Sequence, residues 1–350
     1  MHLLVNLVLL SGQANHKNYL AIQIIRIIMK KTFFYLLIAM ALAGCKDGNL
    51  LFIEASEQKG YHYPYFLFIP DGLDTGQDSY VIIEPNNSGF VDDNLEKHIE
   101  KAERTATKDY YIGNYVAREL KHPLLVPVFP RSKSQWKIYT HALDRDVMHQ
   151  KGNSLERTDQ QLIEMFEDAR QRLKERNINT EDQFLLTGFS ASGTFANRFA
   201  ALHPDKVAAV AAGGLNGLLI LPADSINGKA LNYPLGTNNF EVIMNREFRM
   251  DLFKNTPQYY FMGELDDNDA IPYDDAFDDD ERELIYEIMG KEMQPERWNY
   301  CKKIYKDAGI HATVKTYTGL GHEHPEEIKE EITAFFRNAI NGKVESKLSR

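Results

Sequence analysis

Near its middle the chain reads Phe184-Leu-Leu-Thr-Gly-Phe-Ser-Ala-Ser-Gly-Thr-Phe-Ala-Asn-Arg-Phe-Ala-Ala-Leu-His-Pro204. An apolar run meets a turn of small residues, and a helical pattern begins directly after the turn. This order is typical of a strand-to-helix turn that exposes a serine hydroxyl above a sheet, at the positive end of the following helix. We therefore interpret Ser190 as a catalytic nucleophile, and the alternative is a plain strand–helix turn.

The turn matches the pattern G-x-S-x-G except at its last position. Gly188 lies two residues before Ser190, but Ser192 stands where the second glycine is usual. A hydroxymethyl group is small enough for many such turns, so the departure is modest. After the helix, the segment 207–212 is an all-apolar strand that needs cover on both faces, as in a parallel sheet.

The block from Phe184 to Gly214 resembles the esterase branch of the α/β-hydrolase superfamily that includes polyhydroxybutyrate depolymerases and feruloyl or acetyl-xylan esterases. The resemblance is specific over this block and looser over the rest of the chain. It implies an α/β-hydrolase fold, with a mostly parallel central sheet and helices on both faces. It also implies a serine hydrolase that requires no cofactor.

Outside this block, strands and helices alternate, which by itself predicts a mostly parallel sheet covered on both faces. The expected strands cover 63–69, 80–84, 123–129, 184–186, 207–212, 258–262 and 313–317. The expected helices cover 93–120, 155–176, 281–290, 294–308 and 325–341. The segment 218–256 breaks this alternation. It either carries lid or substrate-binding elements or packs as an ordinary loop.

A serine hydroxyl needs a histidine to take its proton and a carboxylate to orient that histidine. In the α/β-hydrolase fold both follow the serine in the chain. The strand at 258–262 leads into Gly263-Glu-Leu-Asp266, and Asp266 is the expected acid, with Asp267 and then Asp269 as alternatives. Two other interpretations are solvated loop carboxylates and a calcium site, although the EF-hand spacing and its glycine are absent.

The expected base lies in Tyr317-Thr-Gly-Leu-Gly-His-Glu-His-Pro325. His322 follows a Gly-x-Gly turn after the last strand, where the family places its histidine, and His324 is the rival. A metal-binding His-x-His pair would need a third ligand at suitable spacing. None accompanies this pair, so we predict no metal site.

The expected oxyanion hole uses two backbone N–H groups. One belongs to Ala191, immediately after the nucleophile, and the other to Asn87 in the loop after an early strand. The His-Gly-Gly of many esterases is replaced here by Asn86-Asn87-Ser88-Gly89, which leaves the subfamily open.

The N-terminus predicts export. Met29-Lys30-Lys31 is a basic start, and an apolar core leads to Leu42-Ala43-Gly44-Cys45, which resembles a bacterial lipobox. We interpret 1–28 as a mis-assigned extension, 29–44 as a lipoprotein signal peptide and Cys45 as the lipidated residue. A buried N-terminal helix that ends in cysteine is the alternative. A tether over 45–58 and a catalytic domain over 59–342 follow, and Cys301 is expected to be half-buried.

The net charge of −10 argues against nucleic acid as a partner. The expected protein is a serine hydrolase anchored in the bacterial cell envelope, acting on a small-molecule or carbohydrate-linked ester. One alternative is a serine peptidase of the prolyl-oligopeptidase type, although those enzymes usually carry a large N-terminal propeller. Another is a binding lipoprotein on a hydrolase scaffold that has lost catalysis.

Overall fold

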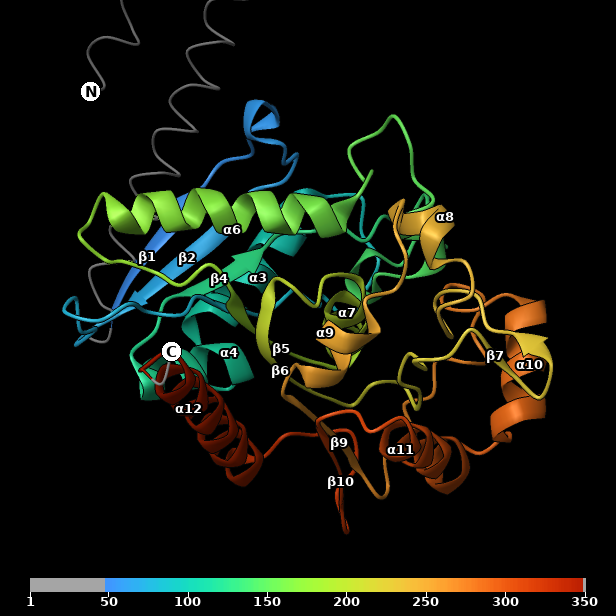
Figure 1. Ribbon diagram of the computed structural model, residues 1–350. Helices are drawn as coiled ribbons and strands as arrows, with labels where there is room; N and C mark the ends of the chain where they lie inside the picture. The colour runs from blue at the N-terminus through green and yellow to red at the C-terminus, as the bar shows by residue number, and fades with distance from the viewer. Residues whose placement is uncertain (1–47, 349–350) are drawn as a thin grey trace, which may run out of the picture. The chain divides into compact units, whose positions relative to one another are not determined.

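The computed structural model describes residues 48–348, and a central sheet of eight strands dominates this part of the chain (Figure 1). The strands are β1 (Gly48–Ile53), β2 (Tyr65–Pro70), β3 (Ile82–Ile83), β4 (Leu124–Pro127), β5 (Phe184–Phe189), β6 (Val207–Gly213), β9 (Gln258–Gly263) and β10 (Ala312–Tyr317). They lie in the order β1-β2-β4-β3-β5-β6-β9-β10. The pairs β1–β2 and β2–β4 are antiparallel, and the other adjacent pairs of this sheet are parallel. The predicted fold class, α/β with a mostly parallel sheet, is confirmed.

Helices connect the strands. The longer ones are α3 (Leu95–Thr107), α4 (Ile112–Leu120), α6 (Thr158–Lys174), α7 (Ala191–Leu202), α10 (Asp279–Met289), α11 (Trp298–Asp307) and α12 (Glu326–Leu348). The shorter elements are η2 (Glu57–Lys59), η3 (Thr140–Ala142), α5 (Arg145–Met148), α8 (Phe240–Met244), α9 (Met250–Asn255), η4 (Met293–Arg297) and the hairpin β7 (Ser225–Ile226) with β8 (Lys229–Ala230).

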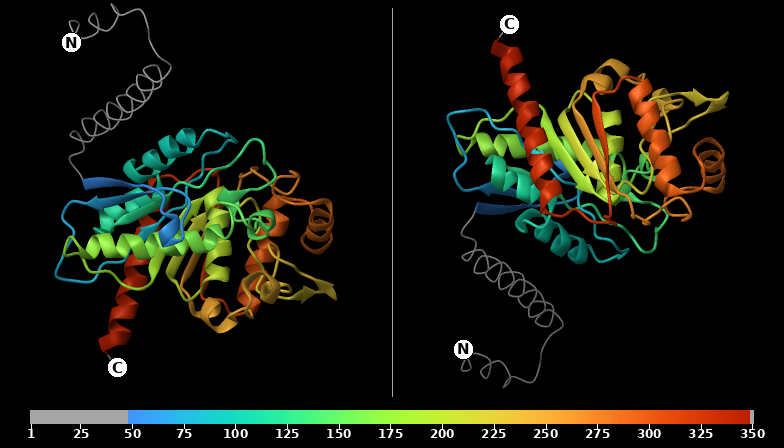
Figure 2. Two further views of the ribbon diagram at one scale, coloured as in Figure 1. Left: turned by 90° about the horizontal axis from the view of Figure 1, so that it is seen from above. Right: turned by 90° about the horizontal axis from the view of Figure 1, so that it is seen from below.

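The sheet has a hydrophobic core on each face because strand side chains alternate between faces. In β5, Phe184 and Leu186 join the core covered by α6, α7 and α11, whereas Leu185 joins the core covered by α3, α4 and α12. Figures 1 and 2 show these two groups of helices on opposite sides of the sheet. A strand buried on both faces has no polar side, which explains the all-apolar runs in the sequence.

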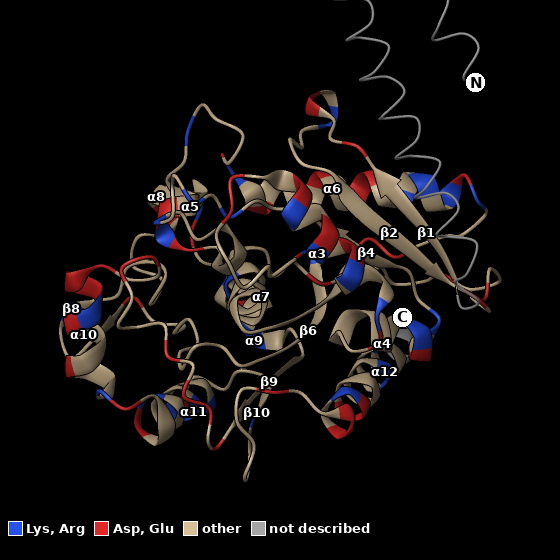
Figure 3. Ribbon diagram, turned by 180° about the vertical axis from the view of Figure 1, so that it is seen from behind, with Lys and Arg blue, Asp and Glu red and all other residues tan. Residues whose placement is uncertain are grey.

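Charged side chains lie mainly on helices and loops. The strands β2, β5, β6 and β9 contain no lysine, arginine, aspartate or glutamate, and the labelled strands among them are tan in Figure 3. No helix in the described part of the chain has both the length and the apolar character needed to cross a membrane.

Several sequence expectations need correction. The predicted tether over 45–58 is wrong from residue 48 onward, because Gly48–Ile53 forms the edge strand β1 and pairs with β2. The helix predicted over 93–120 is two helices, α3 and α4. Cys301 is fully buried rather than half-buried. The predicted extension, signal peptide and Cys45 lie outside the described residues.

Candidate active site

Ser190 lies at the junction of β5 and α7 with φ 62° and ψ −130°. A positive φ is rare for a non-glycine residue and costs free energy, so the surrounding structure must hold it. The two nearby glycines explain how the turn closes. A Cβ atom on Gly188 would stand 2.3 Å from the carbonyl oxygen of Ser192, and one on Gly193 would stand 2.5 Å from that of Gly213. The predicted turn is therefore present, with Ser190 only partly buried at its apex.

Ser192 has a definite structural role. Its Oγ accepts a hydrogen bond from the N–H of Phe189 at 3.0 Å and donates one to the carbonyl oxygen of Phe189 at 2.9 Å. The side chain is 2% exposed. The hydroxyl thus connects the last residue of β5 to the first turn of α7, across the strained residue between them. Ser192 therefore stabilises the turn at the position where the usual pattern has glycine.

Asp266 lies just beyond the carboxyl end of β9 and contacts His322. Its Oδ2 and Oδ1 lie 2.9 Å and 3.1 Å from His322 Nδ1, and Oδ1 also accepts from the N–H of Asn268 at 3.0 Å. Asp266 is buried, whereas Asp267 is exposed and Asp269 pairs with Arg297 at 2.5 Å. Of the three candidate acids, Asp266 is the one whose carboxylate bonds to His322.

His322 is held above the end of the sheet by the elbow itself. Its ring centroid lies 4.6 Å from that of Phe189, and its Cε1 would lie 2.8 Å from a Cβ atom on Gly214. The N–H of Ser190 bonds to the carbonyl oxygen of Gly213 at 2.9 Å, so Ser190 and His322 lie against two consecutive glycines, Gly213 at the end of β6 and Gly214 directly after it.

His322 Nε2, the atom that would receive a serine proton, faces the side-chain amide of Asn268. The two nitrogens are 3.2 Å apart. With Nδ1–H directed to Asp266, Nε2 is an acceptor and Asn268 Nδ2 donates to it. Among the described residues no hydrogen bond joins Ser190 Oγ to His322. Such catalytic hydrogen bonds commonly tighten only when substrate is bound. Sequence reasoning did not single out Asn268.

His324, the alternative base, lies apart from the acid. It is 8% exposed and packs edge-on against Phe189 and at a tilt to Tyr110. Burial lowers its pKa to about 4. Its Nδ1 has no hydrogen-bond partner in residues 48–348. This histidine is a packing residue in the described structure.

The loop after β3 lies beside the elbow. Ile83 pairs with Leu186, and Asn87 and Ser190 each follow four residues later, at the same edge of two neighbouring parallel strands. Within the described chain, neither the Ala191 nor the Asn87 backbone N–H has an acceptor. Free N–H groups at this edge are the donors that an oxyanion hole requires.

A buried hydrogen-bond network fixes that loop. The side chain of Asn86 accepts from the N–H of Phe129 and donates to its carbonyl oxygen, both at 2.9 Å. Ser88 Oγ lies 2.6 Å from Nδ1 of the fully buried His98. The residues on either side of Asn87 are therefore anchored to the protein interior, which was not foreseen from the sequence.

The acidic segment 266–280 does not gather its carboxylates around one point. Asp274 bonds to Arg282 at 2.8 Å, Asp275 pairs with Arg131, and Asp278 pairs with Arg145. In the described residues no group of three histidine, cysteine, aspartate or glutamate side chains is arranged to hold a metal ion. These carboxylates pair with arginines, which argues against the interpretation of the segment as a calcium site.

The predicted insertion 218–256 begins with a run that packs into the core, whereas much of its remainder is exposed. Leu218, Leu219, Ile220 and Leu221 are all buried, and the N–H of Ile220 bonds to Asn197 Oδ1 on α7 at 2.8 Å. This run supports the ordinary packing interpretation, except that Leu218 also lines a small cavity beside the site.

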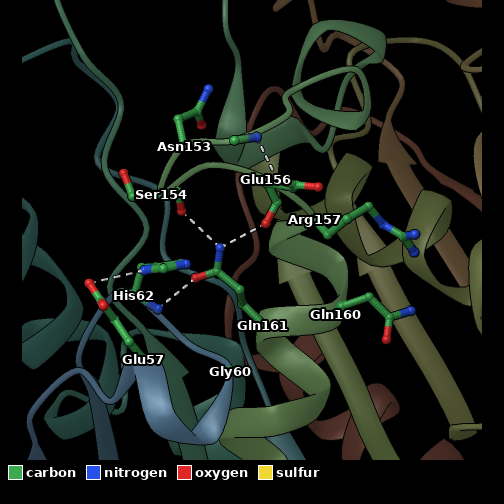
Figure 4. A pocket seen from close by; sticks show the side chains of 10 residues that line it. Glu57, Gly60, His62, Asn153, Ser154, Glu156, Arg157, Gln160 and Gln161 are labelled. Carbon is green, nitrogen blue, oxygen red and sulfur yellow. Dashed lines mark hydrogen bonds and ion pairs between the residues drawn. The ribbon is translucent and has the colours of Figure 1, made fainter.

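A larger cavity, of about 510 Å³, lies between η2 and the start of α6 (Figure 4). Gln161 crosses its floor, accepting from the N–H of His62 at 2.9 Å and donating to the carbonyl oxygens of Ser154 and Glu156 at 2.8 and 2.9 Å. Its lining is polar and contains none of the predicted catalytic residues.

Comparison with known proteins identifies the fold of this chain. No family model and no curated protein sequence matches the chain. Among solved structures it is similar to a poly(3-hydroxybutyrate) depolymerase from Bordetella parapertussis, with 15% identity, a TM-score of 0.51 and coverage of 85% of this chain and 92% of that one. It is also similar to poly(aspartic acid) hydrolase-1 from Sphingomonas sp. KT-1, with 13% identity, a TM-score of 0.50 and coverage of 82% and 97%. The chain therefore has the α/β-hydrolase fold.

Proposed function

We propose that the protein is a serine hydrolase that cleaves carboxylic esters through an acyl-enzyme, with Ser190, His322 and Asp266 as its triad. One observation carries the proposal. A serine in a strained conformation at a strand–helix junction follows Phe189, whose ring packs against a histidine whose Nδ1 is 2.9 Å from a buried carboxylate. Backbone strain costs free energy, and a functional role for Ser190 is the best explanation of why the protein keeps this conformation.

The proposed chemistry follows from these positions. Ser190 Oγ attacks the ester carbonyl carbon while His322 Nε2 takes its proton, and Asp266 stabilises the resulting imidazolium. The N–H groups of Ala191 and Asn87 hold the negative oxygen. His322 then protonates the leaving alcohol. Water hydrolyses the acyl-enzyme with the same proton transfers, and no cofactor takes part. The Asn268 amide must leave Nε2 when the serine hydroxyl approaches.

Two of the similar solved structures are named as a depolymerase and a hydrolase. These names support the proposal that this protein is also a hydrolase. A second candidate is a binding protein on a hydrolase scaffold, favoured by the contact of Asn268, rather than Ser190, with His322 Nε2. A fluorophosphonate probe separates the two. Covalent labelling of wild-type protein and its absence in Ser190→Ala support the hydrolase, and an unlabelled wild-type protein contradicts it.

We also propose that the protein is exported and lipid-anchored at Cys45 in the bacterial envelope, where it would meet small-molecule or carbohydrate-linked esters. This part rests on the basic, apolar and Leu-Ala-Gly-Cys pattern of the N-terminal sequence alone.

A further inference from the structure

Arg198 on α7 is a buried cation without a carboxylate partner. It is 4% exposed, its Nη1 donates to the carbonyl oxygen of Ala142 at 2.9 Å, and its guanidinium lies 5.7 Å from the centre of the Phe277 ring. Among the described residues, Arg198 forms no ion pair, and its side-chain hydrogen bond goes to a backbone carbonyl instead of a carboxylate. An arginine keeps its charge and has five N–H donors, so one backbone acceptor leaves most of its hydrogen-bonding capacity unused.

The nearby acids are engaged elsewhere. The carboxylate of Asp144 accepts from the N–H groups of Val147 and Tyr139, at 2.8 and 3.2 Å. Glu281 pairs with Arg145 at 2.9 Å. These carboxylates offset the charge of Arg198 only over longer distances. An isolated buried charge is costly, so a partner supplied from outside would lower the free energy of the site.

Arg198 lines a narrow cavity with room for about one water-sized group, about 10 Å³. Thr194 lines it as well, and its Oγ1 is buried without a hydrogen-bond partner among residues 48–348. Ser190, Thr194 and Arg198 are spaced at four-residue intervals and so lie along one face of α7. The cavity thus holds two unused polar groups on the face of the helix that begins at the proposed nucleophile.

The same cavity lies two side-chain contacts from His322 of the proposed triad. Asn216 forms part of its wall, and Asn216 Oδ1 lies 3.4 Å from Asn268 Nδ2. That amide is 3.2 Å from His322 Nε2. The lining also includes Phe277, from the acidic segment that pairs with Arg131 and Arg145. The cavity wall is therefore linked to the proposed triad through the contact of Asn216 with Asn268.

We propose that this cavity is a substrate subsite that receives one oxygen of a carboxylate, which would accept hydrogen bonds from Arg198 and Thr194. The inference rests on the proposed hydrolase function and adds to it a substrate class, an ester that carries a free carboxylate. Arginine pairs strongly with carboxylates, and the narrow space favours a flat carboxylate over a bulkier phosphate. Eight residues along a helix span about 12 Å. Because helical side chains lean toward the N-terminus, the carboxylate would sit a few bonds from the ester carbonyl.

The test compares charged and neutral esters of matched length. Monoethyl glutarate is paired with ethyl pentanoate for a carboxylate on the acyl side, and 4-acetoxybutanoate with pentyl acetate for the alcohol side. Acid release is followed by pH-stat for wild type, Arg198→Gln and the control Arg170→Gln. Arg170→Gln removes the same charge from a residue on α6 that neither lines the cavity nor contacts its wall.

We expect wild type and Arg170→Gln to prefer the charged ester in at least one pair by about tenfold or more in kcat/KM, mainly through KM. Arg198→Gln should lose that preference and keep the neutral ester within about threefold. Equal rates for charged and neutral esters in wild type overturn the subsite, as does an equal loss on both esters in Arg198→Gln. Should Arg198→Gln not fold, Thr194→Val is used instead, with about a threefold loss expected on the charged ester only.

Binding without turnover separates this inference from the proposed function. In Ser190→Ala, monoethyl glutarate or 4-acetoxybutanoate should raise the unfolding temperature, and adding Arg198→Gln should remove the shift. If the probe labels Ser190 but the enzyme shows no preference for the charged esters, the hydrolase proposal stands and the subsite is overturned. A carboxylate-dependent shift in an unlabelled protein supports the subsite and contradicts the hydrolase. No shift with either ester overturns the subsite.

Discussion

His322 Nδ1 lies 2.9 Å from Asp266 Oδ2, although 56 residues separate them in the chain. The two residues follow β10 and β9, which are adjacent parallel strands, with Tyr317 opposite Gly263 at their carboxyl ends. Parallel pairing brings the loops after both strands to one edge of the sheet, and the elbow after β5 opens at the same edge. The proposed catalytic groups meet there because the sheet aligns the strand ends.

Ser190→Ala should abolish hydrolysis of small aryl esters and leave the fold intact. The hydroxyl is needed only for the chemistry, and its loss from a triad costs about three to six orders of magnitude in kcat. Steady-state kinetics and a thermal melt of the same preparation check both parts.

Ser192→Ala is the matched control. It removes the two hydrogen bonds to Phe189, so it should lower the free energy of unfolding by about 1–3 kcal/mol and reduce activity far less than Ser190→Ala. Loss of activity in Ser192→Ala with retention in Ser190→Ala would place the nucleophile elsewhere.

Asp266→Asn and His322→Ala should each reduce turnover by about a thousandfold or more, because the serine is left without a correctly oriented general base. Turnover at a fixed pH under saturating substrate is the measurement. Asp267→Asn is the control for the acid, since Asp267 is exposed and has no contact with His322 among the described residues.

His324→Ala is the control for the base. It removes a buried ring that packs on Phe189, so its main effect should be on stability, with a much smaller loss of turnover than His322→Ala. Comparable losses of turnover in the two variants, at equal stability, would contradict the assignment of His322 as the sole base.

Glu84→Gln should stabilise the protein at alkaline pH. Glu84 is 4% exposed, and burial raises its pKa from 4.5 to about 7. The folded pKa is above the unfolded value, so the carboxyl favours folding below about pH 4.5, and that contribution is lost as the pH rises through about 7. Glutamine is never charged and keeps an acceptor for the N–H of Gly113.

The expected gain is about 3 kcal/mol near pH 8, falling toward zero near pH 5, since each pKa unit corresponds to about 1.4 kcal/mol. Denaturant unfolding of both proteins at several pH values measures it. A stability difference that does not change with pH would show that Glu84 is not the titrating group.

Cys45→Ser should escape labelling by lipid precursors and lose membrane anchoring. The reason is that the thiol of the cysteine in a lipobox is the group that receives the lipid. Metabolic labelling with a fatty-acid analogue and fractionation of the host cells test this. A native, membrane-bound protein whose N-terminus lies upstream of residue 45 would be incompatible with the prediction.

The sequence predicts the parts of this protein that depend on local pattern. The run from Phe184 through Gly193 predicts a strand, a strained turn and a helix, because buried parallel strands must be apolar throughout and only small residues fit the turn. The all-apolar β6 is predicted for the same reason. The prediction from local pattern was wrong at β1, because an edge strand with polar neighbours resembles a tether in sequence. It was also wrong between α3 and α4, because the polar pattern of the sequence continues through the break between the two helices.

Chain order and local spacing favour Asp266 as the acid and His322 as the base but leave Asp267 and His324 as alternatives. In the tertiary structure, Asp266 is buried and bonds to His322, whereas Asp267 is exposed. His324 packs on Phe189 instead of bonding to the acid. Local sequence carries no signal for Asn268 beside His322 or for the isolated charge of Arg198. Those features arise where segments far apart in the chain meet, and the sheet, through the register of its parallel strands, determines where that happens.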